Sequence, residues 1–103
     1  MNDEPLARID AALDNIRPAA NEYVKSLHLL KIQTTKDNYG PVLAFLTRLQ
    51  KESGEMAPLF LIAMVGEGYP LATAKQLNTL FGWPASVDAL LNREYLKDVE
   101  VSA

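Results

Sequence analysis

Acid–base chemistry is the first function that the polar residues of this chain could serve. Asp10 and Asp14 are four residues apart, and on a helix this spacing places two carboxylates on one face, about 6 Å apart, where they could act as general acid and base. His28 is the only histidine and stands among leucines. The two aspartates fall on an ordinary polar face, however, and we expect His28 to be a half-buried structural residue. We therefore predict no catalytic residue and no enzymatic activity.

Metal and cofactor sites have little support in the sequence. The chain contains no cysteine, so it can form no disulfide, no thiolate metal site and no cysteine nucleophile. A single histidine would need carboxylates alone to complete a metal site. Glu67 stands between two glycines, but this stretch lacks the longer glycine spacing and the lysine of a phosphate-binding loop. We predict a turn there, and no metal or cofactor.

The charge of the chain argues against a general polyanion-binding protein. The net charge is −3 at pH 7, whereas nucleic-acid binding requires a basic surface. Residues 20–54 carry five basic and three acidic groups, a net +2, while residues 70–103 carry three basic and four acidic groups, a net −1. The basic excess therefore lies away from the C-terminal third of the chain.

The sequence also shows no segment typical of a membrane span or of a signal peptide. The longest apolar run, Met56 to Val65, contains Pro58 and is too short to span a bilayer. The N-terminal residues lack the basic start and apolar centre of a signal peptide. The sequence predicts a soluble, cytoplasmic protein without membrane contact.

The prolines divide the chain into its expected elements. All six precede or open a segment with helical apolar spacing, and proline suits the first turn of a helix. The spacing of the apolar residues predicts about six short helices and shows no convincing strand pattern. This predicts an all-α fold. The predicted helices cover residues 5–17, 18–32, 41–52, 55–65, 71–81 and 84–97. The second of them could be a kinked continuation of the first.

The helices are predicted to form one compact domain over residues 1–103, which is long enough for a single core. Residues 1–32 are expected to form a helical hairpin or an arm, and residues 41–98 a helix-turn-helix-like core. The segment 55–65 is apolar all round and should be buried at the centre. We expect the apolar stripe formed by Leu6, Ile9, Leu13 and Ile16 to cover that segment, although the first helices could also serve as a dimer arm.

The last two helices have the spacing of a helix-turn-helix. This motif requires a small residue in the first helix, a glycine in the turn and apolar positions that dock the second helix. The residues that supply these are Ala74, Leu77, Gly82, Val87 and Leu90. With the buried segment before them, the two helices predict a winged-helix-like arrangement in which little chain remains for a wing.

Residues 58–91, "PLFLIAMVGEGYPLATAKQLNTLFGWPASVDALL", resemble a known family. The apolar helix, the turn with glycine and proline, the next helix and the Gly82-Trp83-Pro84 turn are similar to the N-terminal winged-helix-like domain of the alkylmercury (organomercurial) lyases. The resemblance covers about a third of the chain. Those enzymes carry their catalytic cysteines and aspartate in a following domain that this chain lacks, so the resemblance transfers no catalytic residue. It implies a helix-turn-helix used for protein contact.

Eight residues are predicted to face a partner protein or DNA: Lys75, Gln76, Trp83, Ser86, Asp88, Ala89, Asn92 and Arg93. Base readout favours basic and amide side chains, which only Asn92 and Arg93 supply on the last helix, and Asp88 would repel phosphates. Trp83 could either staple the turn to the core or be an exposed binding anchor.

Two functions remain open from the sequence. The first is a small non-enzymatic regulatory or adaptor protein whose helix-turn-helix-like scaffold binds an unidentified protein or a second copy of the chain. The alternative is a dimeric DNA-binding transcriptional regulator that reads the major groove with residues 85–94. The acidic group on the last helix and the missing wing favour the first function.

Overall fold

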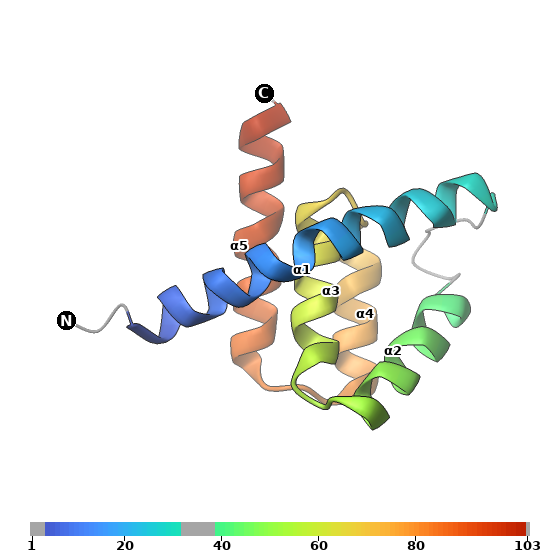
Figure 1. Ribbon diagram of the computed structural model, residues 1–103, viewed down its shortest axis with the longest axis horizontal. Helices are drawn as coiled ribbons and strands as arrows, with labels where there is room; N and C mark the ends of the chain where they lie inside the picture. The colour runs from blue at the N-terminus through green and yellow to red at the C-terminus, as the bar shows by residue number, and fades with distance from the viewer. Residues whose placement is uncertain (1–3, 32–38, 103) are drawn as a thin grey trace.

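The structure is all-helical over the residues that it describes. A computed structural model describes residues 4–31 and 39–102, and these form five helices and no strand (Figure 1). The helices are α1 (Glu4–Leu29), α2 (Gly40–Glu52), α3 (Met56–Gly66), α4 (Leu71–Phe81) and α5 (Ala85–Ser102). The all-α prediction is confirmed, and the predicted number of about six helices is one too high.

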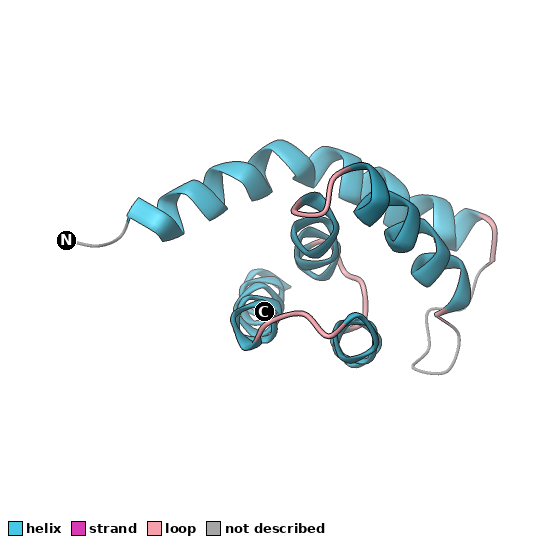
Figure 2. Cartoon of the chain, turned by 90° about the horizontal axis from the view of Figure 1, so that it is seen from below, coloured by secondary structure: helices cyan, strands magenta, loops and turns pink. Residues whose placement is uncertain are grey.

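The difference lies in α1, which is a single helix of 26 residues with Pro18 inside it. Proline has no N–H to donate to the preceding turn and usually ends or bends a helix. Here Leu13, Ile16 and Ala20 are buried on both sides of Pro18, so packing on the core keeps the helix continuous. Figure 2 shows α1 arching over the other helices. The helical hairpin expected within residues 1–32 does not form in the described residues, and the second predicted helix is a continuation of the first.

Helix α3 is the centre of the molecule, as its apolar sequence predicts. The other four helices all contact it, and seven of its eleven residues are buried. The buried residues are Ala57, Phe60, Leu61, Ile62, Ala63, Met64 and Val65. The apolar stripe of α1 packs here: Leu13 and Ile16 are buried, Ile9 is partly buried, and Leu6 remains 45% exposed. The prediction that α1 covers α3 is therefore correct.

Helices α3, α4 and α5 run side by side in alternating directions. Figure 1 shows all three along the same axis, and Figure 2 shows them end-on. Gly82 ends α4 with the left-handed φ of 69° that glycine adopts without strain. The predicted order of helix, turn and helix is present in α4 and α5.

Candidate functional site

The predicted partner-facing residues of α4 and α5 form a small surface with its charges already paired. Lys75 Nζ lies 3.6 Å from Asp88 Oδ1, which links the two helices. The Asn92 amide donates a hydrogen bond of 3.4 Å to the other carboxylate oxygen of Asp88. Three others lack such contacts in this surface: Gln76 is half-buried, and Ser86 and Ala89 are exposed. This surface is open to solvent but offers no unpaired cation among these residues.

Trp83 fixes the turn between α4 and α5. Its ring stacks on Phe81 with ring centroids 4.4 Å apart and planes inclined by only 4°. Both rings are partly buried and pack against the core, and the Trp83 backbone N–H lies 3.4 Å from the Asn78 carbonyl oxygen. Of the two roles that the sequence allowed, Trp83 thus serves the structural one, with part of its ring still accessible.

Arg93 points toward α1, not outward to a partner as predicted. Its Nη2 lies 2.5 Å from Asp10 Oδ1 and 3.3 Å from Glu94 Oε2. The Asp10 contact joins residues 83 positions apart in the sequence, which no local spacing could reveal. Asp10 is therefore more than part of a solvated polar face, because it binds α1 to α5.

Glu94 is the residue that sequence reasoning missed. Its side chain is completely buried and contacts three cations: Arg17 Nη1 at 3.0 Å, Arg93 at 3.3 Å and Lys97 Nζ at 3.2 Å. The signal was present, since Glu94 follows Val87 and Leu91 at helical spacing on the inward stripe of α5. Tyr95, the next residue, is 40% exposed.

A glycine makes room for this buried carboxylate. A Cβ atom on Gly66, the last residue of α3, would lie 3.0 Å from both Arg17 Nη1 and Glu94 Oε1. Real Cβ atoms rarely approach neighbours so closely, so a larger residue would push the ion pair apart. Gly66 thus allows the end of α3 to lie against the contact between α1 and α5.

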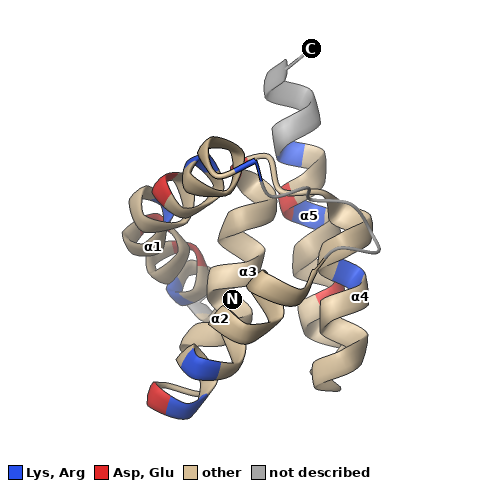
Figure 3. Cartoon of the chain, turned by 90° about the vertical axis from the view of Figure 1, so that its right-hand side faces the viewer, with Lys and Arg blue, Asp and Glu red and all other residues tan. Residues whose placement is uncertain are grey.

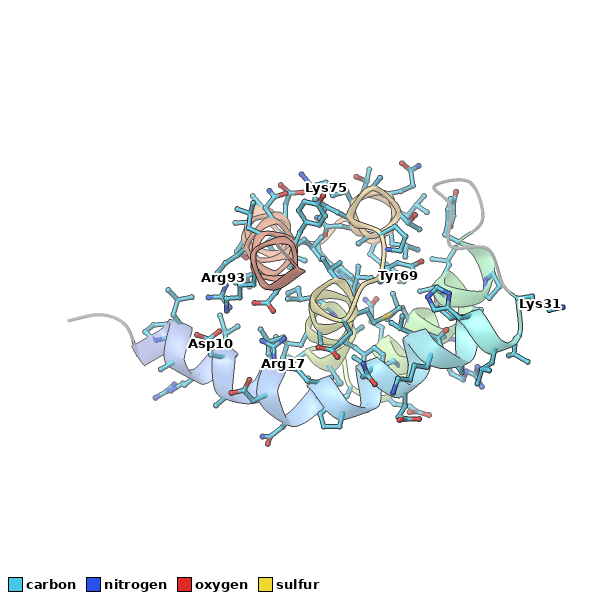
Figure 4. All side chains as sticks on the ribbon, turned by 90° about the horizontal axis from the view of Figure 1, so that it is seen from above. Asp10, Arg17, Lys31, Tyr69, Lys75 and Arg93 are labelled. Carbon is cyan, nitrogen blue, oxygen red and sulfur yellow. The ribbon has the colours of Figure 1, made fainter. Side chains whose placement is uncertain are left out.

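The six charged residues around this point, which we call the Glu94 cluster, balance one another. They are Asp10, Asp14, Arg17, Arg93, Glu94 and Lys97. Burial alone would lower the pKa of the Arg17 guanidinium, but the hydrogen bonds and negative charges of Asp14 and Glu94 outweigh it and raise the pKa above its ordinary value. Figure 4 shows Asp10, Arg17 and Arg93 pointing into the space between α1 and α5. Three cations and three carboxylates leave no net charge to bind a ligand, so the cluster is suited to holding helices together.

Other polar residues considered from the sequence are accounted for by the fold. The Asn21 amide of α1 donates a 2.8 Å hydrogen bond to Glu67, which ties the turn after α3 to α1. His28 is exposed, so the expectation of a half-buried histidine is wrong. No group of three or more metal-ligating side chains occurs in the described part of the chain.

Two hollows lie along α2, away from the predicted site residues. One of about 220 Å³ is lined by Phe45, Arg48, Leu49 and Glu52. The other, of about 460 Å³, follows the outer face of the helix from Gly40 to Lys51.

No family model matches the chain, and neither the curated proteins nor the solved structures gave a match. The resemblance to the alkylmercury lyase domain rests on the residues quoted above alone. None of the helices described is both long and apolar enough to cross a membrane.

Proposed function

We propose that the protein is a small non-enzymatic regulatory or adaptor protein that binds another protein through the outer surface of α4 and α5. One observation carries this proposal: each basic side chain described on these two helices is already in an ion pair. Lys75 pairs with Asp88, Arg93 with Asp10, and Lys97 with Glu94. Binding to DNA depends on cations that are free to neutralise phosphates. The alternative, a DNA-binding regulator that reads the major groove with residues 85–94, is therefore disfavoured.

The distribution of charge and apolar groups also supports a protein partner. Figure 3 shows basic and acidic residues interspersed over the helices on the side in view. Leu80, Tyr95 and Leu96 on α4 and α5 are 50%, 40% and 57% exposed. Aromatic and apolar side chains supply most of the energy of protein interfaces.

The DNA alternative is tested by fluorescence anisotropy with random-sequence duplex DNA at low and moderate salt. We expect no binding at micromolar protein. Binding that weakens steeply as salt rises would show counterion release from phosphates. That result would replace our proposal with the DNA-binding alternative.

The protein-binding surface is tested by affinity capture with two matched variants. Ala89→Arg places a long cation on the exposed face of α5, and Ala44→Arg makes the same change on exposed α2. We expect Ala89→Arg to lose a partner that the wild type and Ala44→Arg retain. Retention by both variants would show that the partner binds elsewhere. Light scattering over a range of concentrations distinguishes a second copy of the chain from a different protein.

A further inference from the structure

The first turns of α1 are held less firmly than the rest of that helix. Among residues 5–12 no residue is buried, whereas five residues from Leu13 to Leu27 are. Ile9 is the large apolar residue of these turns that packs against the core, and Leu6 is 45% exposed. Apolar burial therefore does little to keep this end of α1 in place.

An ion pair bridges this end of α1 to α5. The two helices are not among the pairs whose backbones pack closely over several residues. Asp10 reaches across to Arg93, and Figure 4 shows both side chains directed into the space between the helices. Two turns further along α1, Arg17 makes the corresponding bridge to Glu94.

The two bridges differ in their access to water. The Asp10 and Arg93 side chains are 44% and 29% exposed, while Glu94 is completely buried. Salt screens charges that water reaches and has much less effect on buried ones. Rising ionic strength should thus weaken the Asp10 bridge first and leave the Glu94 bridge in place.

From this difference we propose that the Asp10–Arg93 ion pair is a salt-sensitive latch. It holds residues 4–12 of α1 against α5 at low ionic strength and releases them as salt rises. The remainder of α1 stays docked through the Arg17–Glu94 pair and the buried apolar stripe. Release withdraws Ile9 from the edge of the core, so that the latch controls whether this part of the core is covered.

Amide hydrogen exchange, resolved by residue with NMR, tests the latch in the full chain. Asp10→Asn removes the charge and keeps the shape of the side chain. Asp14→Asn is the matched control, because Asp14 pairs with Arg17 within α1 and is 74% exposed. In the wild type, exchange at residues 9–12 should rise about fivefold between low and high salt, as expected for loss of an exposed ion pair.

The variants separate the latch from other causes. Asp10→Asn should show the faster exchange already at low salt and should respond to salt less than the wild type does. Asp14→Asn should behave as the wild type does, and the amides of α3 should be unchanged in all three proteins. Equal rates in the wild type and Asp10→Asn at low salt, or a salt response of undiminished size in Asp10→Asn, would overturn the proposal. A parallel acceleration in α3 would do so too, because it would show global rather than local opening.

Discussion

At the scale of single residues, Tyr69 brings an unpaired polar group into the core. Its side chain is 2% exposed, and its hydroxyl has no hydrogen-bond partner among the described residues. Burial, with a smaller contribution from nearby Tyr23, raises the pKa of the Tyr69 phenol well above its ordinary value of 10.0. A buried hydroxyl without a partner costs stability, and a raised pKa makes that stability depend on pH.

Tyr69→Phe tests both effects. Near pH 7 the variant should be as stable as the wild type or about 1 kcal/mol more stable, because the unpaired hydroxyl is gone. Above pH about 10, Tyr69 of the unfolded wild type loses its proton while the folded protein retains it. Wild-type stability should therefore fall as pH rises through this range, and less steeply in Tyr69→Phe. Urea unfolding from neutral pH to above this value measures the difference.

The control for this measurement is Tyr95→Phe, since Tyr95 is 40% exposed. It should retain the wild-type fall. Part of the fall should also persist in Tyr69→Phe, because burial raises the pKa of Tyr23 although the charge of Arg48 opposes it. Identical pH dependence in the wild type and Tyr69→Phe would contradict our account of Tyr69.

At the scale of elements, the contact between α1 and α5 depends on the buried carboxylate of Glu94. Glu94→Ala should lower the free energy of unfolding by about 3 kcal/mol, because it removes the partner of partly buried cations. Asp88→Ala is the control on the same helix: Asp88 pairs with Lys75 but is 45% exposed, so its loss should cost less than about 1 kcal/mol. Chemical denaturation of the two variants measures the difference. Equal losses of unfolding free energy would show that the burial of Glu94 does not strengthen its ion pairs.

The elements show which features local sequence can predict. The bounds of α4, Leu71–Phe81, are those predicted, because proline precedes it, glycine follows it and its apolar spacing is regular. The predicted break at Pro18 is wrong, because burial of neighbouring α1 residues outweighs the local preference of proline. The predicted outward orientation of Arg93 failed for a different reason. Its partner, Asp10, lies on another helix, and the sequence contains no local sign of that contact.

At the scale of the whole molecule, every other helix packs against α3. A loss of packing in α3 should therefore destabilise the whole fold. Leu61 is completely buried, so Leu61→Ala should cost about 3 kcal/mol. Leu96→Ala removes the same atoms from a 57% exposed position and should stay within about 0.5 kcal/mol of the wild type. Circular dichroism and the fluorescence of the single tryptophan, Trp83, should report the same midpoint. Separate midpoints would show that α4 and α5 unfold independently of the rest.

The close approach at Gly66 also constrains how the sequence can diverge. A side chain at position 66 would occupy the space in which Arg17 meets Glu94. Alanine or serine there would require the ends of the Arg17 and Glu94 side chains to shift by a few tenths of an ångström. In diverging descendants of this chain, the two positions are expected to change together, with position 17 following. Such correlated substitution would identify relatives even where overall similarity has faded.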